Sequence, residues 1–230
     1  MRPLGRKLGA EFIGTFFQTL VAMGVDVLYY TGTGHIDYVS RWLARGFITA
    51  AMIYAFSGVS GAHIDPAVSL GFFVRRAMAL PQLLWYWIAQ FAGGFGAALL
   101  LFALWGHAIV LGASHPGPSF THLQAAIAEA ILTFLLMLVI LMTAKAAAVG
   151  KQSALAVGLT VAACGFFAGP VSGASMNPAR SIPPQILGGA LNLVWIYSIG
   201  PCAGAVLAAL VMTLFFARPG EGERKAAKGE

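Results

Sequence analysis

Long apolar runs alternate with short polar or glycine-rich segments along the whole chain. The runs cover roughly residues 8–30, 42–60, 80–104, 121–144, 152–169 and 190–217. A helix needs about 20 mostly apolar residues to cross a bilayer, and each run is close to that length. The pattern therefore predicts an all-α membrane protein with six transmembrane helices, three in each half of the chain.

Two further apolar stretches are too short to cross a membrane. They cover about residues 66–74 and 178–187. Each begins with a proline, Pro66 or Pro178, and proline is favoured at the first helical position. The residues before them, Asp65 and Asn177, are good N-caps. Each stretch is therefore expected to form a half-helix that starts near the middle of the membrane.

The segments that precede the two half-helices share one polar motif. Residues 60–67 read Ser-Gly-Ala-His-Ile-Asp-Pro-Ala, and residues 172–180 read Ser-Gly-Ala-Ser-Met-Asn-Pro-Ala-Arg. Irregular backbone at membrane depth is tolerated only where it is buried in protein or lines water. The free carbonyl groups of residues 60–64 and 172–176 are therefore expected to line a path for a polar permeant.

Other matched pairs recur in the two halves at nearly the same offset. They are Ala10-Glu11 with Ala128-Glu129, and Ala89-Gln90 with Gly200-Pro201. Their order predicts two copies of one unit, about residues 8–104 and about residues 121–217. Because each copy has an odd number of spans, the second enters the membrane from the opposite side. The result is an inverted repeat, which commonly forms a translocation path.

Composition and charge place the chain in a bilayer. Hydrophobic residues make up 59% of it and charged residues 10%, whereas soluble domains carry about 25% charged residues. The net charge of +6 comes from Arg2, Arg6, Lys7, Arg75, Arg76, Lys145, Lys151, Arg218, Arg224, Lys225 and Lys228, among others. Most flank predicted spans on one side, which indicates cytoplasmic termini in a multi-pass protein of the cell (inner) membrane rather than a nucleic-acid partner. Residues 219–230 are predicted to be a flexible cytoplasmic tail.

No residue pattern predicts catalysis or a bound cofactor. The sequence lacks a nucleophile paired with a base, and its histidines do not have the spacing of metal ligands. Cys164 and Cys202 both fall in predicted spans, so no disulfide framework is indicated. We therefore expect neither an enzyme nor a metal site.

Over residues 8–217 the chain resembles the aquaporin and aquaglyceroporin family. The resemblance rests on the Ala-Glu-x-x-x-Thr start of each unit, on Ser-Gly-Ala-His and Asn-Pro-Ala-Arg, and on the Ala-Gln and Gly-Pro pairs. It implies an hourglass of six tilted helices plus two half-helices, with one pore per subunit and usually four subunits. It also implies that Glu11 and Glu129 hold backbone N–H groups of the motif segments.

The resemblance further implies a pore centre and a narrow filter. The centre would be formed by Asp65, Pro66, Ala67, Asn177, Pro178 and Ala179, and the filter by Arg45, Gly165, Ala174 and Arg180. Asp65 stands where the family has asparagine. An ionised aspartate only accepts hydrogen bonds, so it either changes the pore centre or simply caps its half-helix.

The filter departs from the family in two places. Gly165 replaces the histidine of water-selective members, which favours a wider opening. Arg45 either lies in the pore or turns outward toward Asp26 or Asp37.

These features predict a passive channel for water or small uncharged solutes such as glycerol, urea or an undissociated metalloid acid. Arg180 and Arg45 would repel cations at its outer end. A proton-coupled transporter on an inverted-repeat fold remains an alternative, because membrane carboxylates are also found in carriers. A poorly conducting structural membrane protein, blocked by Arg45, is a third interpretation.

Overall fold

Six helices of membrane length dominate the computed structural model, which describes residues 3–145, 153–216 and 220–229. They are α1 (Leu4–Thr31), α2 (Tyr38–Ser60), α4 (Leu80–Trp105), α5 (His122–Lys145), α6 (Ser153–Ser172) and α8 (Val194–Val211). The predicted six spans are confirmed, with ends that differ from the prediction by a few residues.

The two half-helices are α3 (Pro66–Val74) and α7 (Pro178–Leu187). Their starts match the prediction because the local signals are strong. The Asp65 side chain accepts from the N–H of Ala67, and the Asn177 side chain accepts from Ala179 and Arg180. The prolines follow these caps directly, where no N–H is needed.

Shorter elements connect and extend this framework. They are η1 (Thr33–His35), η2 (Gly106–Gly112), η4 (Leu191–Leu193), the π-helical turn η5 (Met212–Phe216) and α9 (Glu221–Ala226).

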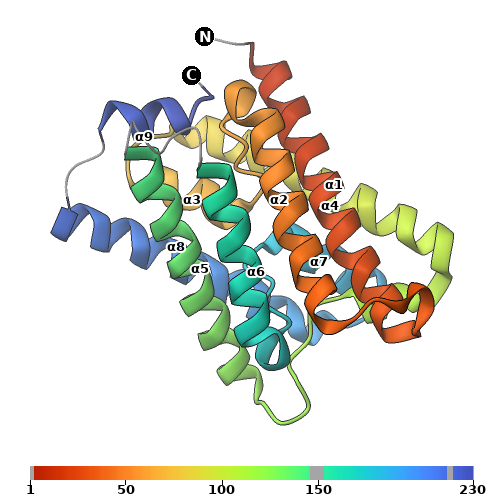
Figure 1. Cartoon of the computed structure of the whole chain (residues 1–230). Helices are drawn as coiled ribbons and strands as arrows, with labels where there is room; N and C mark the ends of the chain where they lie inside the picture. The colour runs from red at the N-terminus through yellow and green to blue at the C-terminus, as the bar shows by residue number, and fades with distance from the viewer. Residues whose placement is uncertain (1–2, 146–152, 217–219, 230) are drawn as a thin grey trace.

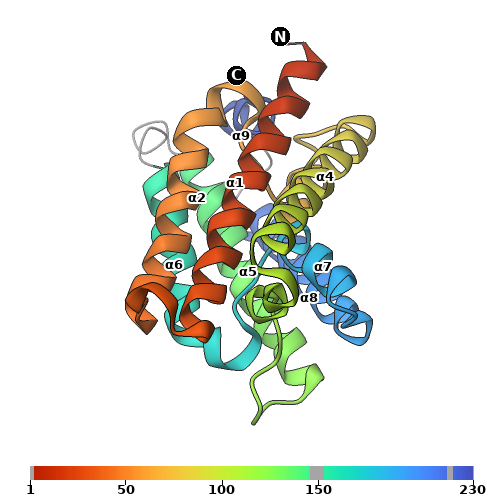
Figure 2. The same cartoon turned by 90° about the vertical axis from the view of Figure 1, so that its right-hand side faces the viewer.

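Each half of the chain supplies three long helices and one half-helix, and the halves exchange contacts. Helix α1 packs against α2 and α4, α5 packs against α6 and α8, and α2 and α6 join the two halves. Half-helix α3 packs against α8, while α7 packs against α4, where Figure 2 shows it beside α4 and α8. The start of α1 and the whole of α9 lie at one end of the bundle (Figure 1), which we call the terminal face.

Glycines allow the long helices to approach closely at matching places in the two halves. A side-chain carbon on Gly93 would lie 2.5 Å from the carbonyl oxygen of Phe12, and one on Gly204 would lie 2.1 Å from that of Ala130. Neither position has room for a larger residue. Small residues at such crossings are the usual basis of helix packing in membranes.

The outward surfaces of the bundle are apolar. Large hydrophobic side chains are exposed on several helices, including Phe47, Leu104, Phe167 and Leu214. So much exposed apolar surface indicates contact with lipid.

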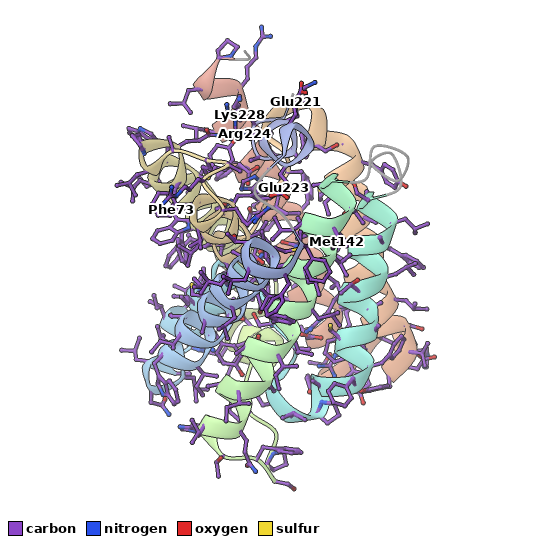
Figure 3. All side chains as sticks on the ribbon, turned by 90° about the vertical axis from the view of Figure 1, so that its left-hand side faces the viewer. Phe73, Met142, Glu221, Glu223, Arg224 and Lys228 are labelled. Carbon is purple, nitrogen blue, oxygen red and sulfur yellow. The ribbon has the colours of Figure 1, made fainter. Side chains whose placement is uncertain are left out.

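Residues 220–229, part of the predicted flexible tail, include helix α9 and contact the bundle. Glu223 is fully buried and forms a double ion pair with Arg75, with 2.7 Å between Nη2 and Oε1 and 2.9 Å between Nε and Oε2. The Lys7 ammonium also donates to the Lys228 carbonyl at 2.5 Å. Figure 3 shows Glu223 on the bundle side of α9 and Glu221 on the outer side. These contacts anchor a polar segment that composition alone marks as disordered.

Arg2, Lys151 and Arg218, which belong to the predicted basic pattern, lie outside the described residues.

Candidate functional site

The two motif segments adopt the same unusual backbone conformation inside the bundle. Ala62 and Ile64 have φ values of 48° and 46°, and Ala174 and Met176 have 42° and 58°. Positive φ is uncommon for residues other than glycine. Such conformations persist only where surrounding contacts enforce them, and they cluster at functional sites.

Glu11 enforces the first conformation from helix α1. Its Oε1 accepts from the Ser60 hydroxyl and the His63 N–H, and its Oε2 accepts from the Ile64 N–H at 2.7 Å and the Gln90 amide at 2.8 Å. The carboxylate is fully buried, so these donors compensate for its loss of water.

Glu129 repeats this arrangement from helix α5. Its Oε1 accepts from the Ser172 hydroxyl and the Ser175 N–H, and its Oε2 accepts from the Met176 N–H at 2.6 Å. The two halves thus hold their motif segments by equivalent bonds.

The side chain of Asn177 links the two halves at the start of α7. Its Nδ2 donates to the Ile64 carbonyl at 2.8 Å and to Oε1 of Gln18 at 3.0 Å. Gln18 in turn donates to Thr49 Oγ1 at 3.2 Å. Both amide N–H groups of Asn177 are therefore bonded to protein in this conformation. The sequence analysis missed Gln18, although it lies two helical turns after Glu11 on the same face of α1.

A cavity of about 310 Å³ extends from this centre toward the terminal face. Gln18, Thr49 and Asp65 line its inner part, and residues of α9 line its other end, including Gly222 and Ala226. Asp65 therefore both caps α3 and borders the cavity, so the two interpretations of this residue are compatible.

A smaller cavity of about 150 Å³ lies at the opposite end of the bundle. Its lining includes Asp26, Arg41, Arg45 and His115. On helix α2, Thr49 lines the large cavity and Arg45, one turn earlier, lines the small one. The two cavities therefore approach each other along α2 from opposite faces.

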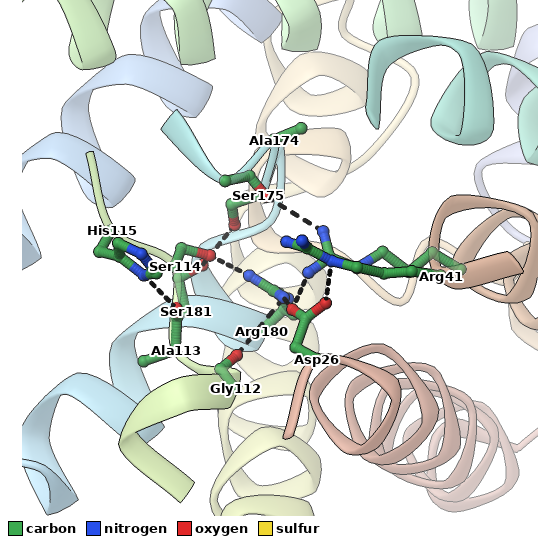
Figure 4. Close-up of polar contacts among 12 residues, drawn as sticks. Asp26, Arg41, Gly112, Ala113, Ser114, His115, Ala174, Ser175, Arg180 and Ser181 are labelled. Atoms are coloured by element: carbon green, nitrogen blue, oxygen red, sulfur yellow. Dashed lines mark hydrogen bonds and ion pairs between the residues drawn. The ribbon is translucent and has the colours of Figure 1, made fainter. Parts of the chain in front are cut away.

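The Asp26 carboxylate of α1 forms ion pairs with three arginines beside the small cavity. Figure 4 shows it between Arg41 and Arg180. Its Oδ1 accepts from Nε of Arg41 at 2.6 Å, and its Oδ2 accepts from Nη2 of Arg180 at 2.7 Å and from Nη2 of Arg45. All four side chains are at most 6% exposed. Arg45 thus takes the orientation toward Asp26 and still lies beside Arg180.

Neutral groups accept further hydrogen bonds from Arg45 and Arg180. Arg45 Nη1 donates to the Gly173 carbonyl at 3.0 Å, which ties α2 to the second motif segment. Arg180 donates to the Ser114 hydroxyl. Arg41 was not singled out in the sequence, although it precedes Arg45 by one helical turn and so shares its face.

The space beside Gly165, where a wider opening was expected, is occupied by Trp42. A side-chain carbon on Gly165 would lie 2.1 Å from Cε3 of Trp42, because the fully buried Trp42 ring fills that space. Ala174 belongs to the same buried cluster as Trp42. The Arg45 guanidinium lies 4.2 Å from the centre of this ring, a cation–π distance. Trp42 therefore occupies the room that the glycine leaves.

Comparison with known proteins identifies the family of the chain. A family model described as Major intrinsic protein matches residues 2–212. Aquaporin NIP2-2 of Zea mays is 39% identical over 212 residues, which cover 91% of this chain and 71% of that protein. Aquaporin NIP1-4 of Oryza sativa subsp. japonica is 40% identical over 212 residues, which cover 91% and 76%.

A solved structure, that of the aquaglyceroporin from Plasmodium falciparum, matches with a TM-score of 0.83 at 24% identity. The match covers 93% of this chain and 97% of that one. It establishes the likeness of the folds.

Proposed function

Because the chain belongs to the major intrinsic protein family and is a passive membrane channel for water and small solutes, we propose that its permeant crosses through the two cavities and between the two motif segments. The observation that carries this path is that the two cavities are lined by adjacent turns of α2. One reaches from Thr49 to the terminal face, and the other reaches from Arg45 to the opposite face.

The proposed cargo is a small neutral polar molecule: water, glycerol, urea or an undissociated metalloid acid. Arg45 lines the small cavity and Arg180 shares its Asp26 partner, so both place positive charge beside the path. Because both are buried, this charge is weakly screened and repels cations. The names of the relatives, aquaporins and an aquaglyceroporin, support water and glycerol as first candidates.

A passive channel explains the buried carboxylates better than a proton-coupled carrier does. A carrier needs a carboxylate that can take up and release a proton. Glu11 and Glu129 each hold three or four donors that fix the motif segments, so protonation would disrupt the fold.

The assembly and orientation are also proposals. We propose that the terminal face is cytoplasmic, because Arg6 and Arg76 are exposed there and basic residues favour that side. Assembly as a homotetramer in the cell (inner) membrane follows from the resemblance of the chain to its family.

Stopped-flow light scattering on proteoliposomes tests the function. Gradients of water, glycerol and urea should each dissipate at a rate that rises linearly with the gradient and does not change with an imposed pH difference. Protein-free liposomes provide the control. Saturable flux that follows the pH gradient would indicate a carrier, and flux equal to that of protein-free liposomes would indicate a structural protein.

A further inference from the structure

The charges around Asp26 do not balance. One carboxylate faces the guanidinium groups of Arg41, Arg45 and Arg180, so the cluster carries two uncompensated positive charges. Within the described residues, none of the three forms an ion pair with any other carboxylate. Buried positive charge without a counter-charge is unfavourable and favours the binding of an anion.

Two hydrogen-bond donors of α2 also lack acceptors. Nε of Arg45 and Nε1 of Trp42 are buried and have no partner in the described part of the chain. The Trp42 ring packs on Gly169, which lines the small cavity. Buried polar groups normally have partners, and both of these groups require an acceptor.

The small cavity offers space for such an acceptor. Its volume of about 150 Å³ exceeds the roughly 30 Å³ that a water molecule occupies in the liquid. Its wall includes Arg41 and Arg45 together with the polar residues Tyr30, Ser114 and His115.

We propose that the small cavity is a binding site for a small monovalent anion of halide or formate size. The anion accepts hydrogen bonds from Arg41 and Arg45. The Asp26 carboxylate binds the same guanidinium groups and therefore competes with the anion for them. One consequence of the site rests on the proposed function: if the permeant passes Arg45 and Arg180, an anion bound beside them obstructs it.

Iodide is the probe for binding, because it quenches tryptophan fluorescence on contact. Trp42 is the reporter, since the guanidinium carbons of Arg41 and Arg45 lie 4.5 Å and 4.2 Å from its ring centre. In purified protein at constant ionic strength, with the large anion gluconate as replacement, quenching should saturate. The saturable part should disappear in Trp42→Phe. Linear quenching that is the same in both proteins would overturn the proposal.

Variants that change the charge of the cluster should change its affinity for iodide in opposite directions. Arg41→Gln should weaken iodide binding at least threefold, and Asp26→Asn should strengthen it by a similar factor. Arg76→Gln removes an exposed charge at the terminal face and should leave binding unchanged. If Asp26→Asn does not fold, Arg41→Gln still decides, because it leaves the bonds of Asp26 to Arg45 and Arg180 in place. Unchanged affinity in Arg41→Gln would reject the site.

Water flux separates this proposal from the proposed function. Iodide in place of gluconate should slow water permeation, with the same half-effective concentration as the quenching. Normal water flux without saturable quenching would remove the anion site and leave the channel intact. Saturable quenching in a protein that passes no water would support the anion site and reject the channel function.

Discussion

Single side chains occupy the centre of the proposed path, between the two cavities. Asn177 has both amide N–H groups engaged, one of them by Gln18, so a permeant must replace that bond in order to accept from Asn177. Gln18 accepts from Asn177 of the second motif and borders the large cavity. We therefore expect the selectivity of the centre to depend on a residue outside both motifs.

Gln18→Ala removes this side chain and enlarges the centre. We expect glycerol permeability to rise at least threefold relative to water permeability, measured by stopped-flow light scattering. Phe17→Ala, at a neighbouring position that is 44% exposed, is the control and should leave the ratio unchanged. Equal ratios in Gln18→Ala and the unmodified protein would place the size limit elsewhere.

Asp65 adds a carboxyl group where the family has an amide. Asp65→Asn should preserve folding, because both residues are good caps and the Ala67 N–H keeps its acceptor. It should lower any proton leak, because it removes an acidic group from the cavity wall. A pH-sensitive dye in matched proteoliposomes measures this leak, and an unchanged leak in the folded variant would show that the acidic group has no such role.

We predict that a substitution at Gly165 mainly lowers the stability of the fold. Gly165→Ala forces Trp42 to move from a carbon that would lie 2.1 Å away, and overpacking of this kind costs about 1–3 kcal/mol. The thermal midpoint in detergent should fall. Gly9→Ala is the matched control, since nothing lies within 4 Å of its added carbon. Similar midpoints for the two variants would mean that Trp42 moves without cost.

Among the secondary-structure elements, α9 is the one that we expect to restrict flux. It lines the terminal-face end of the large cavity, and the buried pair of Glu223 with Arg75 holds it there. Removing one partner of a buried ion pair costs about 3–5 kcal/mol, because the other charge stays uncompensated. We therefore expect that loss of this pair releases α9 and opens the cavity.

Glu223→Gln should raise water permeability at least twofold, and truncation after Phe216 should do the same. Glu221→Gln, two residues away, removes only the exposed pair with Lys225 and should have no effect, because exposed pairs contribute little. Limited proteolysis reports whether α9 has been released. Released α9 without a gain in permeability would show that it does not restrict the path.

The sequence predicted elements well where the signal was local. Pro66 and Pro178 with their caps fixed the starts of α3 and α7 without any knowledge of packing. The sequence did not predict α9, for the opposite reason. Its residues are polar and lack an apolar stripe, and its order depends on Arg75, a partner far away in the chain.

Within the site, the residues that were missed depend on the fold of the whole molecule. Gln18 lies in an apolar run, and a single polar residue there does not show which neighbour its side chain contacts. The space beside Gly165 was read as open because the residue that fills it, Trp42, comes from another helix. Both contacts form only when α1, α2 and α6 pack around the motif segments.

The central claim is that the permeant passes through the described cavities inside one chain, and cysteine modification tests it most directly. In a background with Cys164→Ala and Cys202→Ala, Thr49→Cys places a thiol on the wall of the large cavity. Phe47→Cys, on the same helix, places one at a position that is 61% exposed on the outer surface. Methyl methanethiosulfonate is small enough to reach both.

We predict that modification of Thr49→Cys abolishes most of the water flux in proteoliposomes, that reduction restores it, and that modification of Phe47→Cys changes nothing. Full flux through modified Thr49→Cys, or equal loss at both positions, would contradict the account.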